Sequence, residues 1–171
     1  HNHIETDKIS EFPKKSNNFT FGLMHAGAKT TDAHQNVYAP FTVAKIKNLN
    51  YNYFALGHIH LRQSLSEDPL IVYSGNLQGR HINERKAKGV YLGIVDETTK
   101  KINLDFVKTA PIIWQMADLE LDHEISQSDL TRKIVDILTR KNTQKTLFGL
   151  TISGAQYLSE KELELVNDSD Y

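Results

Sequence analysis

Two short apolar stretches that each run into a histidine, with a helix-like segment between them, constrain the fold of this chain most strongly. The stretches are FTFGLMH (19–25) and YFAL (53–56), the second followed directly by GHIH. Between them, TVAKIKNL (42–49) places its apolar residues at helical spacing and begins with Thr42, a residue suited to cap a helix N-terminus. The order strand, helix, strand predicts a βαβ unit with two parallel strands.

The chain continues with further strand patterns up to a proline. LIVYSG (70–75) reads as another short buried strand, and the polar stretch LRQSLSEDP (61–69) before it reads as a loop. GVYLGIVD (89–96) and KINLDFVKTA (101–110) flank the turn ETTK and predict a β-hairpin. Pro111 then interrupts the pattern.

The rest of the chain alternates strand and helix patterns. WQMADLELD (114–122) and TLFGLTISG (146–154) predict strands, and SDLTRKIVDILTRK (128–141) predicts an amphipathic helix. SEKELELV (159–166) predicts a second helix, whose first serine and fourth-position glutamate form a capping box.

These patterns predict a mixed α/β fold in two parts. Residues 1–110 form the first part, and residues 111–171 form a small strand–helix module, with the boundary near residues 110–113.

Composition narrows the possible chemistry. The 171 residues carry a net charge of −1, so any binding of DNA has to come from a local cluster of basic residues and not from the charge of the whole chain. The chain has no cysteine, which leaves His, Asp, Glu and Asn as the ligands of any metal site. No signal-peptide pattern opens the chain and no apolar stretch is long enough to cross a bilayer, so we expect no membrane association and a cytoplasmic location.

Three histidines form the main candidate site. If the backbone stays extended beyond Gly57, the side chains of His58 and His60 point the same way, because strand periodicity is two. His25 ends the neighbouring parallel strand, at the carboxyl edge where α/β proteins bind ligands. Three imidazoles there predict a site for a transition metal. The alternative is a set of partly exposed histidines at loop starts.

The loop SGNLQGRHINERKAKG (74–89) is a candidate for phosphate binding. Gly75 and Gly79 allow backbone N–H groups to form an anion-binding nest, and Arg80 carries a guanidinium suited to phosphate. The alternative is a solvated basic loop with turn glycines.

Two other histidine patterns carry less weight. Asp32 and His34 form a D-x-H pattern within a polar loop, with no strand to fix the carboxylate. His1 and His3 lie at the ragged start of the chain, where they are as consistent with a tag as with a site.

FGLMHAG, YAPFTVAKIKNLNYNYFALGHIHLRQ and IVYSGNLQGRHINERKAKGVYLGIVD together resemble the calcineurin-like metallophosphoesterases, in particular their DNA repair exonuclease (SbcD-like) branch. The resemblance covers residues 9–110. It implies the C-terminal half of a two-sheet metallophosphoesterase sandwich, with residues 111–171 as the start of a capping, DNA-binding module.

The resemblance also implies a dinuclear site with two divalent metal ions, expected to be Mn²⁺. His25 and His58 match the family histidines that bind one ion, and His60 matches the histidine that binds the other. Two such ions clamp a phosphodiester and lower the pKa of a water between them. Asn76 and Arg80, in the motif YSGNLQGR, are the candidate substrate-binding residues.

The sequence departs from the family in its upstream motifs. The family D-x-H, G-D and G-N-H-D motifs, which supply further ligands and the catalytic histidine, do not stand here in their proper context. No catalytic residue is therefore assigned. Three neutral imidazoles without a bridging carboxylate do not offset the charge of two dications, so the isolated chain is expected to bind at most one ion weakly and to be inactive.

For the parent protein, the resemblance implies a metal-dependent DNA exo- or endonuclease in DNA repair. Its expected partners are DNA, a coiled-coil ATPase of the SbcC type and a second copy of the chain in a homodimer. Two alternatives stay open. One is a phosphodiesterase or nucleotidase for small substrates, and the other is a non-catalytic scaffold subunit that keeps the fold.

Overall fold

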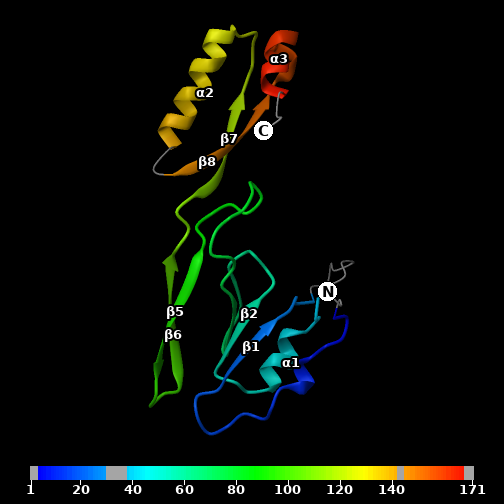
Figure 1. Cartoon of the computed structure of the whole chain (residues 1–171), viewed down its shortest axis with the longest axis vertical. Coiled ribbons are helices and arrows are strands. Elements are labelled where there is room, and N and C mark those ends of the chain that lie inside the picture. The colour runs from blue at the N-terminus through cyan, green and yellow to red at the C-terminus, as the bar shows by residue number, and fades with distance from the viewer. Residues whose placement is uncertain (1–3, 30–37, 142–144, 168–171) are drawn as a thin grey trace. The chain divides into compact units, whose positions relative to one another are not determined.

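The computed structural model describes residues 4–29, 38–141 and 145–167 and divides into two compact units (Figure 1). Unit 1 comprises residues 1–78 and 87–110, and unit 2 comprises residues 79–86 and 111–171.

Unit 1 is built around a four-stranded sheet in the order β1-β2-β4-β3. Strands β1 (Phe21–His25), β2 (Tyr53–Gly57) and β4 (Leu70–Tyr73) are parallel, and β3 (Gln63–Glu67) runs antiparallel to β4. Helix α1 (Val43–Asn48) connects β1 to β2. The expected βαβ unit is therefore confirmed.

Helix α1 forms where its sequence places a cap and an apolar face. The Thr42 side chain accepts a hydrogen bond from the Lys45 amide at 3.4 Å, which satisfies one N–H group of the first turn. Ile46 is fully buried and packs in one core with Phe54 of β2 and Ile71 of β4. The helix thus covers one face of the parallel strands. A short 3₁₀ turn (Ile9–Glu11) adds Ile9 to the same core.

The prediction of a loop over 61–69 was wrong for its central part, which forms β3. The sequence QSLSE has no apolar alternation that would indicate a strand. Backbone pairing with β4 defines the strand instead, and its register shifts between Ser64 and Ser66. An edge strand faces solvent and needs few apolar side chains, so this polar sequence is compatible with it.

The two faces of the parallel strands differ in exposure. On one face, Gly22 lies against Phe54, and a Cβ atom on Gly22 would be 2.2 Å from the phenyl ring. On the other face, Phe21 and Leu23 are 63% and 72% exposed. Exposed apolar side chains of this size, on a strand at the edge of the described sheet, indicate a surface suited to a partner.

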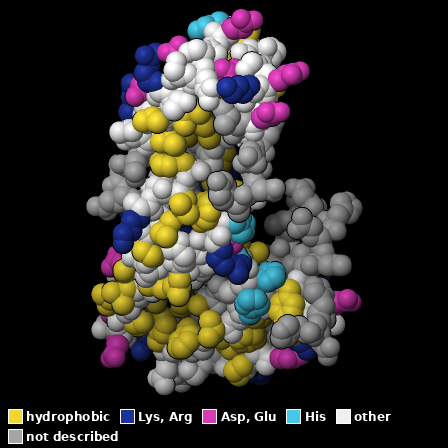
Figure 2. All heavy atoms as spheres, turned by 45° about the horizontal axis from the view of Figure 1, so that its top comes forward, with side chains coloured by type: hydrophobic (Ala, Val, Ile, Leu, Met, Phe, Trp, Pro, Cys, Tyr) yellow, Lys and Arg dark blue, Asp and Glu magenta, His cyan; other side chains and the backbone are white. Residues whose placement is uncertain are grey.

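A β-hairpin completes unit 1. Strands β5 (Gly89–Asp96) and β6 (Lys101–Lys108) pair in antiparallel register, as predicted. Val90, Leu92 and Ile94 share one face of the hairpin and are all exposed. Figure 2 shows hydrophobic side chains gathered on the surface where this hairpin lies.

Unit 2 contains two parallel strands and two helices. Strands β7 (Ile113–Glu120) and β8 (Thr146–Ser153) pair along their whole length. Helix α2 (Gln127–Lys141) connects them, and helix α3 (Glu160–Asn167) follows a 3₁₀ turn (Ala155–Tyr157). The core of this unit contains the buried residues Leu119, Leu121, Leu130 and Leu158.

The predicted capping box at the start of α3 is confirmed. The Ser159 amide donates to Oε2 of Glu162 at 2.8 Å, and the Glu162 amide donates back to the Ser159 hydroxyl at 3.4 Å. Glu162 is only 7% exposed. These reciprocal bonds satisfy two amide groups at the helix N-terminus.

Residues 79–86 cluster with unit 2 rather than with the chain on either side of them. The indole Nε1 of Trp114 donates to the Gly79 carbonyl at 3.0 Å. A Cβ atom on Gly149 of β8 would lie 3.0 Å from the Ile82 side chain, so Ile82 packs directly over that glycine. Trp114, Ile82 and Gly149 therefore hold this segment against β7 and β8.

The mixed α/β class predicted from the sequence is confirmed, with several small sheets and few helices. Within the described ranges, no helix has both the length and the apolar character needed to cross a membrane.

Candidate metal centre

His25 is placed by the register of the two parallel strands. It is the last residue of β1 and pairs with Gly57, the last residue of β2. Parallel strands present their carboxyl ends at one edge of the sheet, so His25 and the segment after Gly57 lie at the same edge. The prediction that the two histidine-bearing strands end side by side is confirmed.

The His25 and His58 rings lie next to each other at this edge. Their centroids are 5.2 Å apart and their planes cross at 76°. The Tyr38 ring lies 5.7 Å from each of them. Both histidines are exposed. The arrangement can present two imidazole ligands to one cation.

Gly57 leaves the space that the His25 ring occupies. A Cβ atom on Gly57 would lie 3.0 Å from Nδ1 of His25, closer than ordinary van der Waals contact. A side chain at this position would push against the imidazole, which would have to shift by a few tenths of an ångström. Glycine before the first histidine of GHIH thus leaves room for the side chain of a residue 32 positions earlier.

The backbone does not stay extended beyond Gly57. His58 follows the last residue of β2 and has φ of +94°, a conformation that non-glycine residues rarely adopt. The condition under which His58 and His60 would share a strand face is therefore not met. The turn directs His58 toward His25.

His60 is exposed, and its backbone is fixed by a buried lysine. The Lys88 ammonium donates to the His60 carbonyl at 2.7 Å, and Lys88 is only 5% exposed. Gly75 has φ of +80° and approaches the same carbonyl so closely that a Cβ atom would lie 2.9 Å from it. Lys88 and Gly75 thereby hold the chain that follows GHIH.

Tyr73 supports the chain that follows His25. Its hydroxyl donates to the Ala26 carbonyl at 2.8 Å and accepts from the Ala28 amide at 3.1 Å. Tyr73 is fully buried, and this burial raises the pKa of its phenol. The buried hydroxyl therefore stays neutral over the ordinary pH range and keeps both hydrogen bonds.

Comparison with known proteins relates the chain to two curated proteins. It is 33% identical over 123 residues to the uncharacterized metallophosphoesterase YhaO of Bacillus subtilis, covering 71% of this chain and 29% of the relative. It is 27% identical over 159 residues to the DNA double-strand break repair protein Mre11 of Thermoplasma acidophilum, covering 86% of this chain and 40% of the relative. The chain belongs to the metallophosphoesterases. No family model matches it.

This metallophosphoesterase chain spans 29% and 40% of the lengths of these two relatives. Both relatives match most of the chain, so the similarity reaches beyond the GHIH segment.

The candidate substrate residues of the metallophosphoesterase chain lie in the two units. Asn76 belongs to unit 1, where its side-chain amide donates to the Gln78 carbonyl at 2.9 Å. Arg80 belongs to unit 2, and its guanidinium is 69% exposed and lies 3.8 Å from Oε1 of Glu84. Glu84 is buried and also accepts from the Arg80 amide at 2.8 Å. This carboxylate orders the loop that carries Arg80.

The donor set fits part of a metal site. Two adjacent imidazoles suit Zn²⁺, Fe²⁺ or Ni²⁺, whereas Mn²⁺ favours carboxylate ligands beside them. The described ranges contain no group of three or more His, Cys, Asp and Glu side chains placed to hold an ion. Asp32 and His34 lie outside the described residues, as do His1 and His3. His25 and His58 thus form a pair of adjacent imidazoles, which we call the half-site; to hold an ion it would need further ligands.

Sequence reasoning missed three residues around the half-site: Tyr38, Tyr73 and Lys88. Each acts through a contact with a residue 13 to 47 positions away along the chain. Tyr73 could have been noticed as a phenol inside an apolar strand, since a buried hydroxyl needs a partner. Tyr38 and Lys88 carry no such signal in the sequence.

Proposed function

We propose that this chain is part of a metal-dependent phosphodiesterase that hydrolyses DNA during repair. The observation that carries the proposal is the pair of His25 and His58 rings, 5.2 Å apart at the carboxyl edge of two parallel strands. The names of the relatives support the same reading, since one is a metallophosphoesterase and the other a DNA double-strand break repair protein.

In the parent protein, His25 and His58 would hold one divalent ion and His60 would contribute to a second. Manganese is the ion we expect. When bound, such ions supply Lewis-acid stabilisation of the attacked phosphate and a more acidic water. The residues of this chain would hold and orient the ions: Gly57 leaves room for the His25 ring, and Lys88 fixes the backbone at His60.

The isolated chain is expected to be inactive. Among the described residues only a two-imidazole arrangement is available, without a third ligand or a bridging carboxylate. Neutral imidazoles do not offset the charge of two dications, so we expect weak binding of one ion at most.

Substrate contacts are proposed for Asn76 and Arg80. The exposed Arg80 guanidinium is able to bind a DNA phosphate, and the buried Glu84 carboxylate holds its loop in shape. Residues 111–171 would start the capping module that contacts duplex. Because the net charge is −1, affinity for DNA should depend on local cations and fall steeply with salt.

The partners we propose are DNA, a coiled-coil ATPase of the SbcC type and a second copy of the protein. The exposed apolar side chains of Phe21 and Leu23 support an interface with a further polypeptide. The location we propose is the cytoplasm, as expected from a sequence that opens with no signal-peptide pattern.

The test compares substrates for the complete parent protein in Mn²⁺. Linear duplex DNA and bis-p-nitrophenyl phosphate are offered to the unchanged protein, to His58→Ala and to His123→Ala. His123 is a matched control, since it is an exposed histidine of unit 2 that pairs with Asp122. We expect cleavage of DNA that His58→Ala abolishes and His123→Ala retains. Hydrolysis of the small ester without DNA cleavage would favour a small-substrate phosphodiesterase, and no hydrolysis of either would favour a scaffold.

A second measurement addresses the isolated chain. Calorimetric titration of residues 1–171 with Mn²⁺ should give at most one weak binding event. Two tightly bound ions would contradict the proposed half-site.

A further inference from the structure

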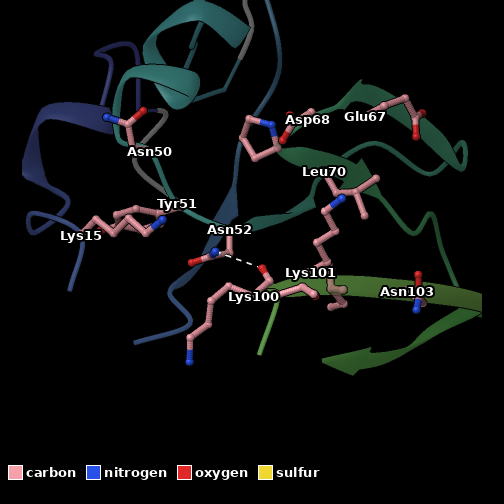
Figure 3. A pocket seen from close by; sticks show the side chains of 13 residues that line it. Lys15, Asn50, Tyr51, Asn52, Glu67, Asp68, Leu70, Lys100, Lys101 and Asn103 are labelled. Atoms are coloured by element: carbon pink, nitrogen blue, oxygen red, sulfur yellow. Dashed lines mark hydrogen bonds between the residues drawn. The ribbon is translucent and has the colours of Figure 1, made fainter. Parts of the chain in front are cut away.

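A second candidate site lies in unit 1, at the opposite end of the parallel strands from the histidines. A pocket of about 520 Å³ is bordered by residues 50–52, just before β2, by residues 67–70, at the turn into β4, and by residues 99–103 of the hairpin (Figure 3). Tyr53 and Leu70, the first residues of β2 and β4, are register partners. Tyr53 and Gly57 are separated by four strand steps, roughly 13 Å. The pocket is therefore separate from the His25–His58 half-site.

Lysines give the pocket its anion-binding character. Lys15, Lys100 and Lys101 line it, and within the described residues none of the three forms an ion pair or a side-chain hydrogen bond. Lys8 and Lys45 of the same unit are, by contrast, paired with Glu11 and Asp7. Figure 3 shows Lys101 extending from the hairpin toward Leu70, whereas Lys100 points away from it. Lys101 is thus the ammonium group best placed to meet an anion, whereas Lys15 lies beside Tyr51 at another wall of the pocket.

The walls of the pocket are fixed by hydrogen bonds that do not involve these lysines. The Asn52 side chain accepts from the Thr20 amide at 3.0 Å and donates to the Lys100 carbonyl at 3.1 Å. It therefore ties the start of β2 to the hairpin turn, as the dashed line in Figure 3 marks. The Asp96 carboxylate accepts from the amides of Thr98 and Thr99 at 2.8 and 3.0 Å, which orders the same turn. Lys101 is consequently presented from an ordered backbone.

The remaining lining residues indicate what else the ligand carries. Asn50 and Asn103 offer side-chain amides at the pocket, and Glu67 and Asp68 offer carboxylates. Amide N–H groups and ammonium groups donate to phosphate oxygens, whereas carboxylates accept from hydroxyl or amino groups. The volume lies within the range of about 300–1,000 Å³ that is common for small-molecule pockets.

From this arrangement we infer that the pocket binds a nucleoside phosphate, with its phosphate at Lys101 and its hydroxyl or amino groups toward Glu67 and Asp68. The inference goes beyond the proposed hydrolysis and does not depend on a metal. The same phosphate chemistry is available from a free nucleotide or from the phosphorylated end of a DNA strand, and the experiment distinguishes the two.

The test uses ¹⁵N-labelled chain of residues 1–171 in buffer with EDTA, so that binding of divalent ions at the histidines does not contribute. AMP, adenosine and inorganic phosphate are titrated separately. AMP should shift the amide signals of Asn52, Lys101 and Asn103, and adenosine should leave them unchanged. The absence of shifts at these residues with AMP at millimolar concentration would overturn the inference.

Variants separate a built site from general charge attraction. Lys101→Ala should weaken AMP binding by roughly tenfold or more, because it removes a charge-assisted hydrogen bond. Lys47→Ala is the matched control, since Lys47 is an exposed lysine of α1 outside the pocket and its loss changes the net charge equally. Equal weakening by Lys47→Ala and Lys101→Ala would overturn the inference. Retained dispersion of the amide spectrum shows that each variant is folded.

A 5′-phosphorylated oligonucleotide identifies the source of the phosphate. If the oligonucleotide displaces AMP at a concentration below that at which AMP half-saturates the pocket, the pocket is assigned to a strand end. Tighter binding of AMP would assign it to a free nucleotide. Both results support a phosphate site, and failure of either ligand to compete with the other would contradict a shared one.

Discussion

The hydroxyl of Tyr73, on β4, donates a 2.8 Å hydrogen bond to the carbonyl of Ala26, the residue that follows His25. The same oxygen accepts from the Ala28 amide. A buried phenol thus holds the backbone on which one of the two adjacent imidazoles depends, across 47 residues of sequence.

Replacement of Tyr73 by Phe tests this support. The change leaves the buried Ala26 carbonyl and the Ala28 amide without the phenol, and we expect the free energy of unfolding to fall by about 1–3 kcal/mol. Urea denaturation followed by circular dichroism measures it. Tyr91→Phe on β5 is the control, because within the described residues the Tyr91 hydroxyl makes no hydrogen bond, and it should change stability little. Equal losses in both variants would show that Tyr73 acts through general aromatic packing only.

Stability should also fall in alkaline solution. Burial raises the pKa of Tyr73, and burial together with Tyr91 raises that of Tyr53. The unfolded state then loses its phenolic protons first, so this contribution is complete below a pH of about 10 and is lost as the pH rises through the folded-state pKa. Denaturation midpoints at a series of pH values above neutrality measure the loss. The decrease of the midpoint with rising pH should be less steep in Tyr73→Phe than in the unchanged protein. An equally steep decrease in that variant would show that Tyr73 does not cause the alkaline loss of stability.

Replacement of Gly57 by Ala tests the placement of the His25 ring. The added Cβ would lie 3.0 Å from Nδ1 of His25, so the imidazole has to shift by a few tenths of an ångström. We expect the weak binding of one Mn²⁺ ion to the isolated chain to become weaker in Gly57→Ala and to be lost in His25→Ala and His58→Ala. Paramagnetic broadening of the histidine signals detects the ion. His60→Ala should retain most of this broadening, and loss of binding in His60→Ala alone would place the ion elsewhere.

Replacement of Lys88 by Met tests the anchor of the GHIH segment. Lys88 is 5% exposed and donates to the His60 carbonyl at 2.7 Å. A methionine keeps most of the buried side-chain volume and removes the donor. We expect a loss of about 1–3 kcal/mol in the free energy of unfolding and faster amide exchange in residues 58–62. Lys108→Met, at the exposed end of β6, is the control and should change neither the free energy of unfolding nor the amide exchange of residues 58–62. Unchanged exchange in Lys88→Met would show that the segment is held by other contacts.

Replacement of Ser159 by Ala tests the capping box of α3. The change removes the acceptor of the Glu162 amide and one hydrogen bond to its carboxylate. The free energy of unfolding of unit 2 should fall by about 1 kcal/mol. Trp114 lies in this unit, so its fluorescence reports the transition. Ser153→Ala, at the exposed end of β8, provides the control. A loss of stability in Ser153→Ala as large as in Ser159→Ala would mean that the cap contributes nothing specific.

The sequence by itself determined the elements that local chemistry governs. Thr42 and Ser159 begin their helices because a side-chain oxygen next to free amide groups satisfies them in any context. The apolar runs ending at His25 and Gly57 form parallel strands because an intervening helix imposes that direction. The spacing of the histidines and the resemblance that they support were therefore readable without coordinates.

Only the tertiary structure decided the details that depend on residues far apart in the chain. The polar segment that forms β3 becomes a strand because β4 supplies its hydrogen-bond partners. The turn at His58, with φ of +94°, brings its ring to His25, whereas an extended chain would have aligned it with His60. Tyr73 and Lys88 hold this arrangement through hydrogen bonds across 47 and 28 residues. Such contacts depend on the packing of separate elements, and that packing leaves no periodic pattern in the sequence.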